Sequence, residues 1–182
     1  ALEVLSEIIA KVADAGDMGE LLGLEGSASR VYFSHFHDMI NTDDVAFDMT
    51  SRNRRPPRDP VNAMLSLTYS LLAKDCAITS LSVGFDPYLG FLHRPKYGKP
   101  ALALDLMEEF RPIICDSVVL SAINNREVTA KDFVKVGKST SLTDRGRRSL
   151  IGAYERRMDT LIRHPLFGYT VSYRRILEVQ AR

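Results

Sequence analysis

The chain has 182 residues, of which 45% are hydrophobic and 26% are charged, and its formal net charge is +1. This composition is that of a globular protein, and a chain of this length builds a core that needs no disulfide framework. No apolar run reaches the roughly 18 residues of a membrane-spanning helix. Because a global basic field is absent, any contact with nucleic acid has to come from local clusters of cations.

The two cysteines, Cys76 and Cys115, lie far apart in the sequence. Neither belongs to a CxxC pair, which excludes a zinc ribbon and a dithiol redox motif. Both fall in apolar helical patterns, so we expect them to be small buried side chains in a reducing compartment. The sequence therefore predicts a cytoplasmic protein.

Apolar residues recur at helical spacing along most of the chain. Asp59 is expected to cap one of the helices, with Pro60 at its first position, and Thr143 to begin another. Pro112 falls inside a long apolar run and predicts a kink there. The predicted helices cover, in order, about residues 2–15, 18–40, 60–77, 86–93, 101–124, 144–162 and 171–182.

Residues 131–142 alternate weakly between apolar and polar side chains around Gly137, which predicts a small β-hairpin. His164, just before Pro165, is expected to end the preceding helix as a surface or capping group. The predicted fold class is therefore all-α. It consists of one helical domain over residues 1–182, with at most this small hairpin.

An arginine-rich segment at residues 52–58 differs in kind from its neighbours. Pro56 and Pro57 exclude a helix there and order the backbone in advance. Guanidinium groups bind phosphate in a bidentate way, so the segment is a candidate phosphate-binding loop. The alternative is a solvated charged loop, which is the usual fate of such runs.

Clustered acids follow His93 in the sequence. If the run from residue 101 is helical, Asp105 and Glu108 lie on one face, because they are spaced i, i+3. Carboxylates on an apolar helix face are costly unless they are paired or bound to a cation. Imidazole with carboxylates suits Mn or Zn, and carboxylates with water suit Mg. On local features alone, a structural histidine beside solvated acids remains the alternative.

Glu25 interrupts an apolar stretch between Gly23 and Gly26. The glycines allow a ligand or another backbone to approach closely, whereas the alternative is an ordinary exposed acid near a helix start. The chain contains no glycine-rich phosphate loop, nucleophile elbow or dinucleotide-binding fingerprint.

Five ordered segments together resemble the integrase of CRISPR spacer acquisition, the universal adaptation endonuclease of the CRISPR-associated proteins. As a set they extend over most of the chain from about Leu21 and are far more specific than a single motif. The segments are residues 24–33, 53–63, 84–93, 100–112 and 142–146.

The resemblance implies a β-domain followed by an α-helical catalytic domain, of which only the second is visible, with residues 1–17 as the entry helix. Family members bind Mg²⁺ or Mn²⁺ through a glutamate, a histidine and a later acid. By motif position these ligands are Glu25, His93 and Glu108. Asp105 is implied as a supporting acid and Glu109 as the adjacent alternative.

The resemblance also implies an activity and partners. The family joins a DNA 3′-hydroxyl to the CRISPR repeat strand by transesterification and can cut DNA. It acts on prespacer DNA as a homodimer with a small ferredoxin-like second adaptation protein, away from membranes. Basic side chains expected to contact DNA are Arg54, Arg55, Arg58, Arg94, Lys96 and Lys99.

Two other readings remain open from the sequence. One is a helical nucleic-acid-binding or partner-docking module whose acids are structural, and the other is a metal phosphohydrolase that acts on a small ester. The integrase reading makes two spatial predictions. Glu25, His93 and Glu108 should converge in one pocket, and the segment 52–58 should lie on the surface beside it.

Overall fold

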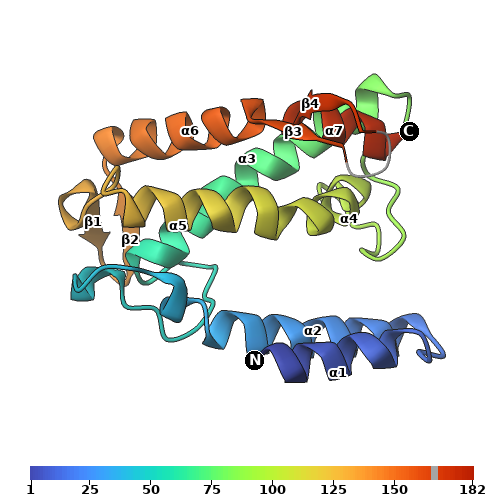
Figure 1. The fold of residues 1–182 in the computed structure, drawn as a ribbon, viewed down its shortest axis with the longest axis horizontal. Coiled ribbons are helices and arrows are strands. Elements are labelled where there is room, and N and C mark those ends of the chain that lie inside the picture. Colours follow the sequence, from blue (N-terminus) through green and yellow to red (C-terminus); the bar gives the residue numbers. More distant parts are fainter. Residues whose placement is uncertain (165–167) are drawn as a thin grey trace.

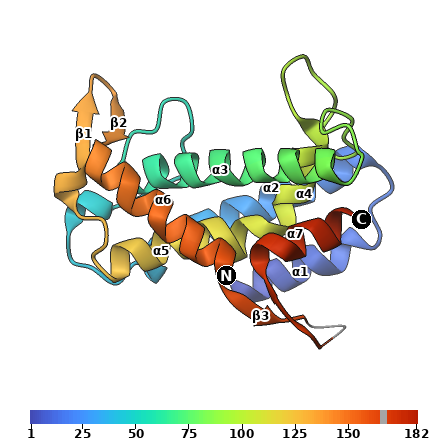
Figure 2. The same cartoon turned by 90° about the horizontal axis from the view of Figure 1, so that it is seen from above.

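The computed structural model describes residues 1–164 and 168–182. Its longest helix, α3 (Pro60–Ser82), forms the axis around which the other elements are arranged (Figures 1 and 2). The remaining helical elements are α1 (Leu2–Val12), α2 (Met18–Ser34), η1 (His37–Met39), η2 (Val45–Phe47), α4 (Ala101–Phe110), η3 (Arg111–Asp116), α5 (Ser117–Asn124), η4 (Ala130–Asp132), α6 (Asp144–Asp159) and α7 (Tyr173–Ala181).

Two short antiparallel hairpins complete the described part of the chain. The first pairs β1 (Phe133–Val136) with β2 (Ser139–Leu142), and Gly137 has a positive φ of 61° in its turn. The second pairs β3 (Leu161–Arg163) with β4 (Thr170–Ser172). The all-α class and the first hairpin are thus confirmed, whereas the second hairpin was not predicted.

The sequence of α3 explains its central place. Asp59 accepts a hydrogen bond from the backbone N–H of Asn62 at 2.8 Å, and Pro60 occupies the first turn, as predicted. Side chains from Val61 to Cys76 are buried around the helix rather than along one stripe, which is the pattern of a helix enclosed by its neighbours. α4, α5, α6, α7 and β2 all contact it.

α4, η3 and α5 form one helical run, and its middle segment is π-helical. The π segment covers Arg111–Asp116 and includes Pro112. Proline lacks an N–H and clashes with the preceding turn, so the chain inserts an extra residue instead of continuing the regular ladder. The kink predicted at Pro112 is therefore found as a π-helical irregularity.

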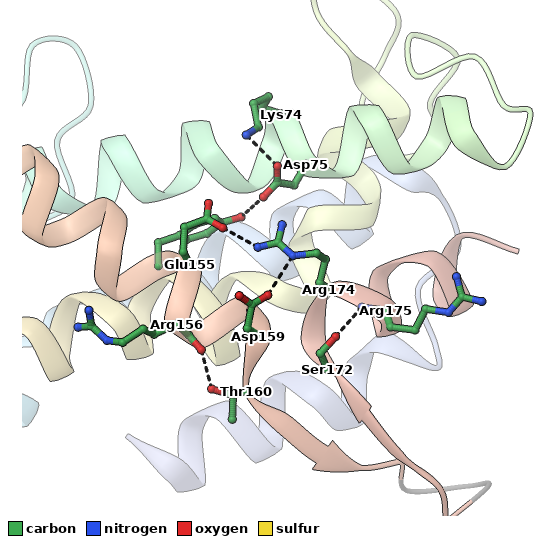
Figure 3. A network of polar contacts seen from close by, with 10 residues as sticks. Lys74, Asp75, Glu155, Arg156, Asp159, Thr160, Ser172, Arg174 and Arg175 are labelled. Carbon is green, nitrogen blue, oxygen red and sulfur yellow. Dashed lines mark hydrogen bonds and ion pairs between the residues drawn. The ribbon is translucent and has the colours of Figure 1, made fainter.

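A polar network joins α3, α6 and α7 (Figure 3). Arg174 on α7 forms ion pairs with Glu155 and Asp159 on α6. On the same side, the Tyr154 hydroxyl of α6 donates to Asp75 of α3 at 2.7 Å. The C-terminal helix is thereby attached to the central one through α6.

Three predicted boundaries and one predicted helix are wrong. α6 ends at Asp159 rather than near residue 162, because Leu161–Arg163 pairs with β4 as strand β3. α3 continues to Ser82 rather than ending near residue 77, and α2 ends at Ser34 rather than near residue 40. Residues 86–93 are not helical, because the backbone N–H groups at 91–93 donate to the Asp105 carboxylate instead of to helix carbonyls. Local periodicity cannot reveal an acceptor that lies on a later helix.

His164 is buried, with its ring 5.1 Å from that of Tyr169, so its predicted surface role is wrong. Pro165, expected to end the helix, lies outside the described residues. Within the described residues, no helix has the length and apolar character needed to cross a membrane.

The cap of α3 gives a first test. The Asp59 side chain accepts from the Asn62 backbone and from the side chains of Asn62 and Asn53. Within the described residues, the Asp17 side chain accepts only from the Glu20 backbone at the start of α2. Asp59→Ala should lower the free energy of unfolding in urea by about 2 kcal/mol or more, and Asp17→Ala by about 1 kcal/mol or less. Equal losses would contradict a special role for the α3 cap.

Candidate active site

His93 and Asp105 are joined by a short contact. His93 Nδ1 lies 2.7 Å from Asp105 Oδ1, and the same carboxylate accepts the backbone N–H groups of Phe91, Leu92 and His93 at 2.6, 3.1 and 2.8 Å. The loop is therefore wrapped around one side chain of α4. With Nδ1 held by the carboxylate, Nε2 is left to bind a ligand, an arrangement typical of metal-binding histidines.

The charge of Asp105 follows from these contacts. Its partial burial raises the pKa, but the hydrogen bonds from the backbone and ring of His93, and from Phe91 and Leu92, outweigh burial and lower the pKa overall. An anionic Asp105 accepts four hydrogen bonds, so it serves as the partner of His93 rather than as a free metal ligand. Its place as a supporting acid of a metal centre stays a prediction.

Gly90 makes this wrapping possible and had no assigned role in the sequence reading. A Cβ at this position would lie 2.7 Å from the Ala101 backbone and 2.8 Å from Asp105 Oδ2, closer than real side chains allow. Only glycine lets the loop approach α4 so tightly. Its position three residues before His93 was the available signal.

Glu108 lies one turn beyond Asp105 on α4 and forms an ion pair with Arg111. The Arg111 guanidinium also stacks on the ring of Tyr69, 4.6 Å from its centroid. Arg52 approaches the same ring at 5.3 Å. Two cations thus contact the Tyr69 ring, and one of them, Arg111, holds the candidate ligand Glu108.

Arg52 points inward, unlike the rest of its segment. It donates to the Asn62 side-chain oxygen at 2.6 Å and to the Asn53 carbonyl at 2.7 Å. Burial lowers the pKa of Arg52 to about 10, because desolvation disfavours the charged form of its guanidinium. The expectation that the whole run 52–58 presents its guanidinium groups to phosphate is wrong for Arg52.

A buried carboxylate, Asp116, lies at the end of η3 in the same helical run. Asp116 is 2% exposed and accepts the hydroxyl groups of Tyr69 at 2.6 Å and Tyr32 at 3.0 Å. Burial raises the pKa of Asp116, and the two tyrosine hydrogen bonds act against that rise. Sequence reasoning missed this residue, because its one local signal is that an acid interrupts an apolar run.

Tyr32 ties α2 to this centre and sets the position of Glu25. α2 runs in the same direction as α4 and α5 (Figures 1 and 2). Glu25 precedes Tyr32 by seven residues, so both lie on the same face of α2. On the facing run, Glu108 precedes Asp116 by eight residues, the same two turns plus the extra residue of the π segment.

The three predicted ligands are not assembled. Glu25 is exposed and makes no side-chain hydrogen bond or ion pair within residues 1–164 and 168–182. In that same part of the chain, no group of three or more His, Cys, Asp or Glu side chains is arranged to hold a metal ion. The structure joins His93 to Asp105 and places Glu108 one turn further along α4, and the assignment of Glu25, His93 and Glu108 as ligands stays a prediction.

The expected DNA-binding cations occupy two ends of the fold. Arg54, Arg55 and Arg58 are exposed in the loop before α3. The basic turn 94–99 follows the C-terminal end of α3, where Arg94 and Lys96 are exposed and Lys99 is half-buried. The arginine loop and the turn that follows His93 thus lie at opposite ends of α3 (Figure 2). The prediction that the segment 52–58 lies beside a pocket of Glu25, His93 and Glu108 stays a prediction.

A helical domain with a carboxylate-held histidine and neighbouring acids is the class that the geometry defines. Residues 1–156 match the family described as CRISPR associated protein Cas1, so the chain belongs to the Cas1 family. The CRISPR-associated exonuclease Cas4/endonuclease Cas1 fusion of Geobacter sulfurreducens is 53% identical over 165 residues, which cover 89% of this chain and 30% of that protein. The CRISPR-associated endonuclease Cas1 3 of Thermus thermophilus is 46% identical over 180 residues, 99% of this chain and 53% of that protein.

Solved structures agree with this assignment. A CAS1 protein from Thermotoga maritima superimposes with a TM-score of 0.89 at 26% identity, over 100% of this chain and 55% of that one. A casposase bound to integration product superimposes with a TM-score of 0.86 at 28% identity, over 95% of this chain and 48% of that one. A chain of a Cas6-RT-Cas1--Cas2 complex superimposes with a TM-score of 0.86 at 29% identity, over 99% of this chain and 19% of that one. The chain thus spans about half or less of the length of these proteins.

The lowered pKa of Asp105 predicts a pH dependence of stability. A carboxylate with a depressed pKa stabilises the fold above its unfolded pKa of about 3.9 and loses that contribution as the pH falls through the folded-state value. The unfolding free energy of the wild type should therefore exceed that of Asp105→Asn at pH 7. The gap should close as urea melts are taken below about pH 4. A gap that stays constant down to pH 3 would contradict the assignment.

The Asp116 bridge predicts unequal tyrosine effects. Tyr69→Phe removes the shorter and more deeply buried hydrogen bond, and it should cost about 2–3 kcal/mol of unfolding free energy. Tyr32→Phe should cost about 1 kcal/mol. Because the hydroxyl groups share one carboxylate, the double variant should deviate from additivity by at least about 0.5 kcal/mol. Strict additivity in urea denaturation would argue against a shared bridge.

Proposed function

We propose that this chain is the metal-dependent catalytic part of a CRISPR-associated endonuclease and integrase that inserts new spacers into a CRISPR array. The observation that supports it most is the His93–Asp105 pair, which leaves Nε2 available in a chain of the Cas1 family, with Glu108 one turn beyond Asp105 on α4. The printed names of the relatives, which include endonucleases, and the casposase bound to an integration product support the same activity.

The proposed cofactor is Mg²⁺ or Mn²⁺, with Glu25, His93 and Glu108 as its ligands. Imidazole with carboxylates is a donor set that fits such a cation. The shared register of α2 and α4 directs Glu25 toward the Glu108 side, so binding requires Glu25 to approach across the space between the helices. A bound cation would supply charge stabilisation to the attacking and leaving oxygens of the phosphodiester.

The chain's own residues have separate parts in this proposal. Asp105 orients the His93 ring and fixes which nitrogen faces the site. Arg111 holds Glu108 and places a positive charge near the phosphate. No side-chain nucleophile is needed, because a DNA 3′-hydroxyl forms the new P–O bond while the repeat strand's own P–O bond breaks and leaves a new 3′-hydroxyl.

The proposed partners are prespacer DNA, the CRISPR repeat, a second copy of the chain and a small ferredoxin-like second adaptation protein. The match to a complex that contains Cas1 and Cas2 supports the last of these. Arg54, Arg55, Arg58, Arg94, Lys96 and Lys99 are proposed to bind the phosphodiester backbone, which sets the position of DNA without reading its sequence.

Substitution of the proposed metal ligands tests the proposal. His93→Ala, Glu108→Ala and Glu25→Ala should each abolish Mn²⁺-dependent cleavage and strand joining of labelled DNA. Asp105→Asn should reduce both by about 10–100-fold, as for other partners of a metal ligand. Glu109→Ala is the matched control, because Glu109 is exposed one residue from Glu108, and it should keep full activity.

Two results would overturn parts of this assignment. Loss of activity in Glu109→Ala but not in Glu108→Ala would move the ligand by one residue. If all three alanine variants cleaved and joined DNA as well as the wild type, the helical binding module without catalysis would be the better description of this chain.

A further inference from the structure

The β1–β2 hairpin is bound to the arginine loop. The Thr140 backbone N–H donates to the Pro57 carbonyl at 2.8 Å, and the Thr140 hydroxyl donates to the Arg58 carbonyl at 2.9 Å. Thr140 is 3% exposed, so both hydrogen bonds are shielded from water. Two segments that are far apart in the sequence therefore form one rigid unit at the N-terminal end of α3.

This unit surrounds a cavity of about 390 Å³, lined by Arg58, Lys135, Lys138, Gly137, Ser139 and Thr140. Its lining residues are cationic or small, and none of them has a hydrophobic side chain. Within the described residues, none of its three cations forms an ion pair with a carboxylate. In contrast, Arg111 and Arg174 are paired with acids. The cavity is therefore equipped for an external anion.

The basic turn 94–99 provides a second group of cations at the other end of α3. Its cations Arg94, Lys96 and Lys99 also lack ion pairs within the described part of the chain. Figure 2 shows the hairpin, the arginine loop and the loop before α4 rising on the same side of α3. α3 has 23 residues and is thus about 34 Å long.

The two groups of cations lie at opposite ends of α3, so its length sets the scale of their separation. That scale is the one of a single turn of duplex DNA, about 34–36 Å, after which the same strand returns to the same face of the double helix. We propose that Lys135 and Lys138 of the hairpin, with Arg58, bind the backbone of duplex DNA one helical turn away from the contact made by the turn 94–99. The inference rests on the proposed function in taking DNA as the polymer, and it adds the hairpin as a binding element and the duplex as the form recognised.

A duplex fits this arrangement better than a single strand. Two rigid cation groups at a fixed separation select a polymer with the same repeat, whereas a single strand has no fixed repeat and relies on stacking with aromatic side chains. The cavity at the hairpin end contains no aromatic residue in its lining. Tyr97 is fully exposed in the basic turn, so preference for a single strand is an outcome that the test has to distinguish.

The test measures DNA affinity by fluorescence anisotropy in EDTA, so that it does not depend on catalysis. Lys135→Ala/Lys138→Ala is compared with the wild type on duplexes of about 20 and about 8 base pairs, since the first exceeds one turn and the second does not. On the longer duplex, the slope of log Kd against log salt should become shallower by about 1.8, or about 0.9 per lost phosphate contact. On the shorter one it should hardly change, because that duplex can still bind at the turn 94–99.

Two controls accompany this variant. Lys11→Ala/Arg175→Ala removes the same charge from α1 and α7, which lie on the other side of α3 in Figure 2, and it should leave the slope unchanged. Lys135→Arg/Lys138→Arg should retain the wild-type slope, because it keeps the charge. Unaltered melting temperatures confirm that the hairpin variants are folded.

An unchanged slope on the long duplex would overturn the proposal. An equal loss on the short duplex, or on a single strand of the longer length, would also overturn it, because the contact would then not depend on a helical turn. Failure of the proposed catalytic function can be told apart from failure of this inference. Glu108→Ala, which tests catalysis, should bind the long duplex with the wild-type salt slope.

Discussion

The architecture depends on one buried carboxylate. Asp116 lies in the π-helical segment and accepts hydroxyl groups from Tyr69 on α3 and Tyr32 on α2. A carboxylate buried to this degree is tolerated only when hydrogen bonds replace its lost hydration. Three helical elements must therefore meet at this point, and neither the direction nor the register of α2 is free to vary.

The contacts around Asp116 also position part of the candidate site. The Tyr69 hydroxyl binds Asp116, while its ring contacts Arg52 and Arg111, and Arg111 holds Glu108. A second arrangement, independent of Asp116, wraps the loop at 91–93 around Asp105 and sets the His93 ring. The histidine and the acids are thus placed by two polar centres on one helical run.

Local signals predicted much of the fold. The caps at Asp59 and Thr143 and the irregularity at Pro112 follow from side chains close in sequence, and all three are found. The predictions fail where the deciding partner is distant. The helix expected at 86–93 is replaced by a loop that Asp105 binds, and Arg52 turns inward toward Asn62.

The candidate site divides in the same way. The spacing of His93, Asp105 and Glu108 predicts that they lie close together, because they belong to one loop–helix unit. The Asp116 bridge and the two tyrosines had no local signature, since each bond joins residues more than forty positions apart. The hairpin lysines were missed for a similar reason, because their link to the arginine loop is made through backbone carbonyls.

The central claim is that Glu25 and Glu108 serve one cation whose histidine ligand is held by Asp105. A crystal of the protein grown with Mn²⁺ and measured at the manganese absorption edge tests this directly. The account predicts one strong anomalous peak in direct coordination with His93 Nε2 and the carboxylates of Glu25 and Glu108, with His93 Nδ1 still on Asp105. A peak bound by Asp105 or Glu109 instead, or one that leaves Glu25 outside coordination distance, would contradict it.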